Sequence, residues 1–173
     1  MKYLVMGHSG SGKSSLTKLI SEIKHIPLLY LDCVHFESDW KARNDEDAKK
    51  IVKEFLDSNG SWVIDGNYFK FELEERVKQA DIIIYLDFNR FDCLIRAYKR
   101  YFKYKGKERE SISKGCYETM DLEFISWILK DGRTKNRIDK FKEIINTDGK
   151  TVFVLKNQKD LDNFINKLKE ESM

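Results

Sequence analysis

The sequence is poor in the residues that mark disulfide-rich, metal-stapled or fibrous proteins. It contains one proline, Pro27, and three cysteines, Cys33, Cys93 and Cys116. The cysteines are odd in number, far apart and without a C-x-x-C pair, so they predict neither a disulfide framework nor a zinc or redox site. Free thiols are typical of a reducing compartment, and we expect a cytoplasmic protein.

Long apolar runs and a strong net charge are also missing. No stretch approaches the ~20 apolar residues of a membrane helix, and the first residues do not read as a secretory signal. The 32 Lys and Arg against 29 Asp and Glu give a net charge of only +3. That balance, with no recognisable nucleic-acid-binding motif, predicts neither a membrane partner nor direct DNA binding. We expect a monomer or a weak homodimer.

What the sequence does contain is a complete phosphate-binding loop directly after a short apolar run. The pattern G-x-x-x-x-G-K-[ST] is filled by Gly7, His8, Ser9, Gly10, Ser11, Gly12, Lys13 and Ser14, and Ser15 follows in the helix. Such a loop points backbone N–H groups at phosphate oxygens. Its lysine reaches the β- and γ-phosphates, and its serine hydroxyl ligates Mg²⁺. A Gly/Ser-rich turn that fits by chance is the alternative, but the strand, loop and helix context favours ATP and Mg²⁺ as cofactors.

Apolar runs alternate with amphipathic helical patterns along all 173 residues. This alternation is typical of an α/β fold, and we expect one domain, 1–173, with a three-layer α/β/α architecture and a parallel sheet in the order 2-3-1-4-5. The predicted strands are 3–6, 28–31, 62–64, 82–86 and 151–155. The predicted helices are 13–24, 45–58, 70–79, 91–103, 121–146 and 160–170. Residues 104–120 fit neither element and predict a mobile, lid-like insertion.

Polar residues follow the predicted strands, at the sheet edge where parallel folds bind ligands. Asp32 could be the base for an acceptor hydroxyl, and Asp65 could organise the waters of a metal ion. We expect both aspartates, with Gly66 and Asn67, to bind the substrate. Either aspartate could instead cap the segment that follows it. For Asp87 we expect helix capping alone.

Two further residues after the second strand are candidates for substrate binding. His35 could contact substrate or move a proton, but a lone histidine is as often structural. Trp40 could stack on a ring of the substrate or pack in the core.

Basic residues gather between Arg90 and Lys107, where seven Lys or Arg accompany one acid, Asp92. Arg96 and Arg100 lie four apart and share a helix face, and Arg109 follows in the loop. Planar guanidinium groups suit the charge of a transferred phosphoryl group, so we predict that role for these arginines and a solvated face for the lysines.

These motifs together resemble the adenylate-kinase-related P-loop kinases, and more closely the bacterial DNA topology modulation (FlaR-related) proteins. The resemblance rests on G-H-S-G-S-G-K-S, L-D-x-x-H-F, W-V-I-D-G-N-Y, A-D-I-I-I-Y-L-D, the R-x-x-x-R pair and a G-K-x-R-x-x-x-x-x-G-C-x-E run from Gly106 to Glu118. It implies that Asp65 lies near the Mg²⁺ water shell and that Arg137 contacts phosphates. It also implies that the segment with Asn157 contacts adenine.

The sequence departs from adenylate kinases after Asp65-Gly66, where Asn67-Tyr68-Phe69 replaces a segment that includes an arginine which grips AMP. The departure argues for a smaller or uncharged acceptor. The sequence therefore predicts a kinase that transfers the γ-phosphoryl group of ATP to a small acceptor, such as a nucleoside, nucleotide or related metabolite. One alternative is an ATP-binding regulator of DNA topology without kinase turnover. Another alternative is a GTPase switch. Such proteins need an N-K-x-D motif after a late strand, and Asn157-Gln158-Lys159-Asp160 does not match it in register.

Overall fold

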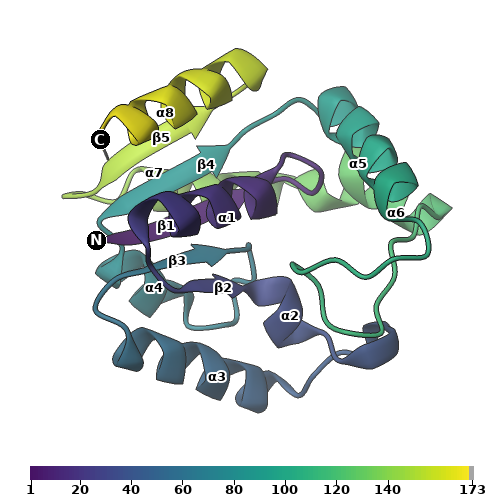
Figure 1. Ribbon diagram of the computed structural model, residues 1–173, viewed down its shortest axis with the longest axis horizontal. Helices are drawn as coiled ribbons and strands as arrows, with labels where there is room; N and C mark the ends of the chain where they lie inside the picture. Colours follow the sequence, from purple (N-terminus) through teal and green to yellow (C-terminus); the bar gives the residue numbers. More distant parts are fainter. Residues whose placement is uncertain (172–173) are drawn as a thin grey trace.

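The computed structural model describes residues 1–171, and its centre is a five-stranded sheet (Figure 1). All neighbouring strands are parallel, in the order β2-β3-β1-β4-β5. The strands are β1 (Lys2–Gly7), β2 (Leu28–Tyr30), β3 (Trp62–Asp65), β4 (Ile82–Leu86) and β5 (Thr151–Leu155). The predicted sheet and its order are confirmed. The single domain predicted for 1–173 ends two residues beyond the described range.

Helices cover both faces of this sheet, as the alternating pattern predicts. They are α1 (Lys13–Lys24), α2 (Leu31–His35), η1 (Ser38–Trp40), α3 (Asp45–Ser58), α4 (Leu73–Gln79), α5 (Arg90–Tyr104), α6 (Leu122–Leu129), η2 (Asp131–Arg133), α7 (Lys135–Ile145) and α8 (Gln158–Glu170). Side chains of α3, α4 and α7 pack on one face, and those of α1, α5, α6 and α8 pack on the other. Each face of the sheet therefore has its own apolar core.

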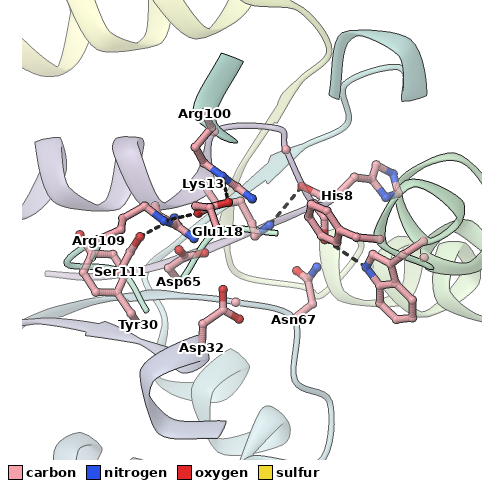
Figure 2. Close-up of a pocket in the computed structure, with 18 of the residues that line it drawn as sticks. His8, Lys13, Tyr30, Asp32, Asp65, Asn67, Arg100, Arg109, Ser111 and Glu118 are labelled. Carbon is pink, nitrogen blue, oxygen red and sulfur yellow. Dashed lines mark hydrogen bonds and ion pairs between the residues drawn. The ribbon is translucent and has the colours of Figure 1, made fainter. Parts of the chain in front are cut away.

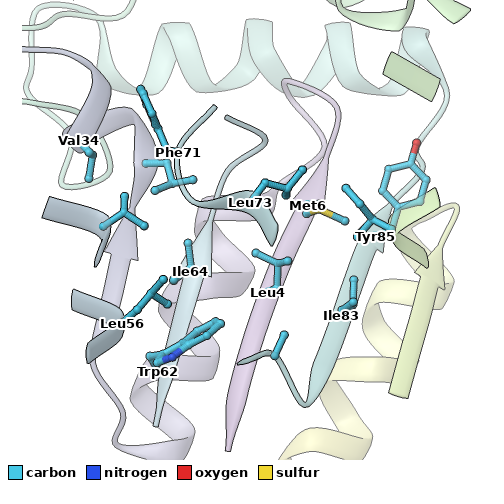
Figure 3. Close-up of a cluster of buried hydrophobic side chains, with 14 of the residues drawn as sticks. Leu4, Met6, Val34, Leu56, Trp62, Ile64, Phe71, Leu73, Ile83 and Tyr85 are labelled. Carbon is cyan, nitrogen blue, oxygen red and sulfur yellow. The ribbon is translucent and has the colours of Figure 1, made fainter. Parts of the chain in front are cut away.

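Alternate residues of β1 point into these two cores. Leu4 and Met6 join the cluster with α3 and α7, whereas Tyr3 and Val5 join the cluster with α1 and α8. Figure 3 shows the first cluster, in which Trp62 of β3 is completely buried. Burial on both faces explains why the strands read as continuous apolar runs.

The long helix predicted over 121–146 is not continuous. It is divided into α6, η2 and α7, with Thr134 in an extended conformation before α7. Gly132 lies in the break, where a Cβ would come within 2.7 Å of the carbonyl oxygen of Trp127. The prediction of one helix was wrong, because α6 and α7 pack on opposite faces of the sheet: Ile128 joins the cluster with α1 and α8, and Phe141 joins the cluster with α3.

Residues 105–121 contain turns but no helix or strand. In Figure 1 this segment leaves the end of α5, runs past α2 and η1, and returns to α6. The chain therefore brings the lid-like segment to the edge of the sheet where the strands end.

Two further findings concern the cysteines and the length of the helices. The three cysteines are free thiols, as predicted. Within residues 1–171, no helix combines the length and apolar composition that crossing a membrane requires.

Candidate active site

The loop of residues 8–12 joins β1 to α1, and the chain from Gly7 onward follows a path that only glycine permits at two positions. Gly10 has a φ of +82°, and a Cβ there would lie 2.3 Å from the carbonyl oxygen of Cys93. Gly7 has a φ of +148°, and its Cβ would lie 2.5 Å from the carbonyl oxygen of Leu86. A side chain at either position would collide with the backbone of β4 or α5. The close packing of the loop against these elements therefore requires glycine.

Lys13 begins α1 and folds back over its own loop. Its Nζ donates to the carbonyl oxygen of His8 at 3.1 Å. The His8 ring is buried, with Nε2 3.2 Å from the Tyr85 hydroxyl oxygen and 3.5 Å from Asp87 Oδ1. Burial lowers the pKa of His8 below its usual value, although the bond to Asp87 opposes the shift. The ring is therefore neutral at pH 7, and Lys13 supplies the positive charge of the loop.

Asp87 does not cap the helix that follows it, so that prediction was wrong. Asn89 is the N-cap of α5, and its Oδ1 accepts from the backbone N–H groups of Phe91 and Asp92 at 2.9 and 3.0 Å. Asp87 bonds to His8 instead, and this bond lowers the pKa of its carboxyl. The physical reason is distance along the chain, because Asp87 lies two residues before the position from which a side chain reaches the first turn.

A cavity of about 1120 Å³ lies in front of the loop. Most predicted site residues line it: His8, Ser9, Gly10, Gly12, Lys13, Ser14, Ser15, Asp32, His35, Trp40, Asp65, Gly66, Asn67, Arg96, Arg100, Arg109 and Arg137. The predicted residues outside the lining are Gly7, Ser11 and Asn157. The ends of parallel strands thus bring together residues that are far apart in sequence.

Asn157 is the N-cap of α8. Its Oδ1 accepts from the backbone N–H of Asp160 at 3.0 Å, and Asp160 Oδ2 accepts from the backbone N–H of Lys156 at 2.9 Å. These reciprocal bonds explain the polar residues after β5 as a helix start. The predicted contact of Asn157 with adenine stays a prediction.

Asp65 ends β3 and is almost completely buried. Its side-chain Oδ1 has no hydrogen-bond partner among the described residues. Burial raises the pKa of this carboxyl to about 6, while the charge of Lys13 and the hydrogen bond with Ser14 oppose the increase. Because an unpartnered buried polar atom is costly, Asp65 is suited to a ligand that enters from the cavity.

Asp65 and Ser14 fit a magnesium ion held mainly by phosphate and water oxygens. Residues 1–171 contain no cluster of three or more His, Cys, Asp or Glu side chains suited to a metal. Mg²⁺ bound with nucleotide needs only one or two protein oxygens, since phosphates and water complete its octahedron. The unpartnered Asp65 oxygen is thus the observation that fits this ion.

Asp32 lies in the first turn of α2, and the Tyr68 hydroxyl donates to its Oδ1 at 2.8 Å. Tyr30 is the N-cap of α2, and no side-chain bond caps this helix. Asp32 is therefore not a helix cap. Figure 2 shows its carboxylate and that of Asp65 pointing into the same space beside Lys13.

Asn67 ties the end of β3 to the beginning of the glycine-rich loop. Its Oδ1 accepts from the backbone N–H of Gly7 at 3.1 Å, and its Nδ2 donates to the Gly7 carbonyl at 2.5 Å. The sequence predicted only substrate binding for Asn67. The structure shows that its amide also fixes the end of β3 against the start of the glycine-rich loop.

Arg100 and Arg109 converge on Glu118, a residue to which sequence analysis assigned no role (Figure 2). The Nε atoms of Arg100 and Arg109 lie 3.0 and 2.7 Å from the two carboxylate oxygens of Glu118. Burial is the main cause that lowers the pKa of Arg100, and the charge of Arg109 adds to it. Two of the three predicted arginines therefore lie together, with a carboxylate between them.

Arg96 packs against the glycine-rich loop rather than with the other two arginines. Its guanidinium lies 4.4 Å from the centre of the Phe88 ring, and Nη1 donates to the carbonyl oxygen of Ser11 at 2.7 Å. It also bonds to Gln158. Arg96 thus braces the loop from α5 while still lining the cavity.

Arg137 lies apart from the other arginines, at the end of the cavity formed by α6 and α7. Its guanidinium stacks over the Trp127 ring at 4.6 Å, and Trp127 Nε1 donates to the Ser9 hydroxyl at 3.1 Å. Trp127 lies in the helix predicted over 121–146 and had no predicted role in the site. Its exposed indole edge is set by the break after α6, which the sequence pattern does not show.

The lid-like segment docks on the residues around Trp40. The backbone N–H of Trp40 donates to Cys116 Sγ at 3.3 Å, and its indole Nε1 donates to the carbonyl oxygen of Tyr117 at 3.1 Å. Ser113 bonds to the carbonyl oxygen of Phe36. Trp40 also has a left-handed φ of 59°, a conformation that costs a non-glycine residue about 1–2 kcal/mol. These contacts hold the indole ring at the cavity.

Comparison with known proteins establishes the fold. No protein-family model and no curated protein matches the sequence. A shikimate kinase from Acinetobacter baumannii, solved with shikimate, superposes with a TM-score of 0.62 at 16% identity, over 98% of this chain and 91% of that one. A putative kinase from Chloroflexus aurantiacus gives 0.57 at 12% identity, over 99% and 97% of the two chains. A shikimate kinase from Bacteroides thetaiotaomicron gives 0.54 at 15% identity, with the same coverage.

These similarities confirm the P-loop kinase fold. They give no support to the narrower resemblance to DNA topology modulation proteins.

Proposed function

We propose that this protein is a kinase that transfers the γ-phosphoryl group of ATP to a hydroxyl of a small acceptor. The observation that carries the proposal is the arrangement around one cavity, with the Lys13 loop on one side and the carboxylates of Asp32 and Asp65 facing it. P-loop kinases need these parts, a phosphate cradle and an acidic residue near the reacting hydroxyl. The kinases among its structural neighbours have the same fold and agree with this assignment.

The donor side is formed by the loop and the arginines. Lys13 leaves its bond to the His8 carbonyl and binds the β- and γ-phosphates, while the loop N–H groups bind the phosphate oxygens. Ser14 and Asp65 hold Mg²⁺, which neutralises charge on the phosphates when it is bound. Arg100 and Arg109 approach the transferred group, because bidentate guanidinium groups stabilise the charge on its oxygens.

On the acceptor side, Asp32 accepts the proton of the attacking hydroxyl. The acceptor oxygen forms a bond to the γ-phosphorus, the bond from that phosphorus to the bridging oxygen breaks, and ADP leaves with the electron pair. The hydrogen bond from Tyr68 fixes the orientation of the Asp32 carboxylate. Tyr68 itself stays protonated, because burial raises the pKa of its hydroxyl.

The alternative of a non-enzymatic DNA-binding regulator has less support in the structure. Of the basic residues on α5, Arg96, Lys99, Arg100 and Lys103 line the cavity, where phosphates of a bound nucleotide are the fitting anions. DNA binding by this block would predict a measurable, salt-dependent shift of a duplex at physiological ionic strength. The kinase proposal predicts no such shift.

The test is an assay of ADP release from Mg-ATP with a panel of nucleosides, nucleotides, sugars and sugar acids, with each phosphorylated product identified by mass. Acceptor-stimulated release is expected with at least one member. Asp32→Asn should lower kcat by about 100-fold or more, because the general base is lost. The matched control Asp39→Asn changes an exposed carboxylate outside the cavity and should leave kcat unchanged. ADP release that no acceptor stimulates would contradict the proposal.

A further inference from the structure

The acceptor end of the cavity has a wall of aromatic rings. Trp40 and Phe36 have ring centres 5.1 Å apart, and Phe36 and His35 have centres 4.4 Å apart. The wall continues from His35 to Tyr68 at 4.8 Å and from Tyr68 to the buried Phe71 at 5.2 Å. The first four of these rings line the cavity. A continuous ring surface of this kind favours a flat, apolar group as its ligand.

The histidine of this wall is a neutral ring. Burial is the largest cause that lowers the pKa of His35, and the nearby charge of Lys70 lowers it further. Asp45 and Asp32 act in the opposite direction. His35 therefore offers a ring face at neutral pH and gives no positive charge to attract an anionic ligand.

Cations in the same part of the chain are already committed to protein partners. Arg76 is completely buried and donates to the backbone carbonyls of Phe71 and Tyr68. Arg43 donates to the carbonyl oxygen of Val34 at 2.8 Å and does not line the cavity. Neither guanidinium is available to grip a phosphate or carboxylate on the acceptor.

The charged groups that residues 30–71 contribute to this end of the cavity are mainly carboxylates. Within residues 30–71, Lys70 is the one cation that lines the cavity, and its Nζ lies 2.5 Å from Asp45 Oδ1. Asp32 and Asp65 line the same end.

An anionic acceptor would therefore meet two carboxylates, and residues 30–71 supply no free cation to bind it. In the proposed complex Lys13 binds the donor phosphates. Arg100 and Arg109 are paired with Glu118 or approach the transferred group. An uncharged acceptor avoids this repulsion.

We propose that the acceptor is an uncharged molecule with a planar ring and a hydroxyl group, with the chemistry of a nucleoside. This inference rests on the proposed kinase function and names the substrate class of that site. The acceptor ring stacks on Trp40, and Phe36, whose ring is edge-on to that of Trp40, borders it. The acceptor hydroxyl reaches Asp32, which takes its proton as the new oxygen–phosphorus bond forms. The 5′-monophosphates of the same nucleosides are excluded by Asp32 and Asp65.

The experiment compares aromatic with non-aromatic acceptors and uncharged with anionic acceptors, and ribose is the non-aromatic compound that is also uncharged. ADP release is measured with adenosine, cytidine and thymidine, with their 5′-monophosphates, and with the non-aromatic hydroxyl compounds ribose, gluconate and shikimate. For at least one nucleoside, kcat/KM should exceed that of its monophosphate and of every non-aromatic compound by about tenfold or more. Higher kcat/KM for the monophosphates or the non-aromatic compounds overturns this inference and leaves the kinase function standing. ADP release that none of these compounds stimulates rejects the kinase function itself.

Variants of Trp40 separate stacking from lid attachment. Trp40→Ala should raise the acceptor KM about tenfold with little change in kcat, while Trp40→Phe keeps a ring and should retain most of the affinity. Trp40→Phe also removes the bond from Nε1 to Tyr117. Equal losses in both variants would show that this bond, and not the ring, supports binding, and would overturn the inference. Phe102→Ala, on an exposed position of α5 outside the cavity, is the control for loss of an aromatic side chain.

A binding measurement makes the result independent of turnover. Titration calorimetry with a non-hydrolysable ATP analogue and Mg²⁺ should show nucleoside binding that Trp40→Ala weakens. Tighter binding of the monophosphate than of the nucleoside in this experiment would contradict the inference directly.

Discussion

Arg109 and Glu118 form an ion pair inside the candidate active site, with Nε and Oε1 2.7 Å apart and side chains only 12% and 3% exposed. The other carboxylate oxygen of Glu118 accepts from Arg100. The carboxylate therefore holds two guanidinium groups together much as a phosphate would.

Glu118→Gln should lower the free energy of unfolding by about 2 kcal/mol, because two partly buried guanidinium groups lose their counter-charge. Pyrophosphate should recover part of this loss, since a bound anion replaces the missing carboxylate. The measurement is urea unfolding with and without pyrophosphate, with Glu54→Gln as a control on an exposed face of α3. An equal loss under both conditions would show that the carboxylate does not occupy an anion position.

Lys13→Ala should weaken binding of Mg-ATP by about 100-fold, because charge-assisted bonds to the β- and γ-phosphates are lost. Titration calorimetry measures the affinity, and Lys53→Ala on the exposed face of α3 is the matched control. Unchanged ATP affinity in Lys13→Ala would show that the nucleotide binds elsewhere.

Asp65 should make the metal-free, nucleotide-free protein less stable as pH rises from about 4 to 6. Burial raises the pKa of its carboxyl in the folded state to about 6, above the value of 3.8 for the free group. The folded state thus binds more protons in this window, and stability falls as the proton is lost. This difference between the two pKa values corresponds to a loss of about 3 kcal/mol in the free energy of unfolding, in the limit of complete burial.

Asp65→Asn removes this titration, so the stability of the variant relative to the wild type should increase across the same window. Urea unfolding in the presence of EDTA at about pH 4, 5, 6 and 7 measures the free energy of unfolding of both proteins. Parallel pH profiles for the two proteins would refute the assignment.

Asn89→Ala should lower the free energy of unfolding by about 1 kcal/mol, because two backbone N–H groups of α5 lose their acceptor. Asn89→Ser retains a capping oxygen and should stay close to the wild type. Thermal or urea unfolding distinguishes them, and equal stability of Asn89→Ala and wild type would argue against the cap.

The sequence predicted the sheet and the glycine-rich loop because both depend on local patterns. Apolar runs define the strands, and the octapeptide from Gly7 to Ser14 follows the first of them. The strand-end aspartates could be located without coordinates, since parallel strands end at one edge. Asp32 and Asp65 do line one cavity.

The pairings within the site could not be predicted, because they depend on how an aperiodic segment folds back. Glu118 lies 18 residues after Arg100, in a stretch without helical or strand pattern. The available signal was that Glu118 ends a quoted motif that also contains Arg109. The break between α6 and α7 had a local signal in Gly132, which the apolar periodicity obscured.

The segment 104–120 contacts both sides of the proposed site, through the ion pair of Glu118 with Arg100 on the donor side and through Tyr117 and Cys116 with Trp40 on the acceptor side. In the proposed kinase, donor affinity and acceptor choice are therefore expected to be coupled. A substitution in the segment that favours a new acceptor will also alter nucleotide affinity. Evolution or engineering of a new specificity is then expected to need paired changes, one in the segment and one in the residues around Trp40.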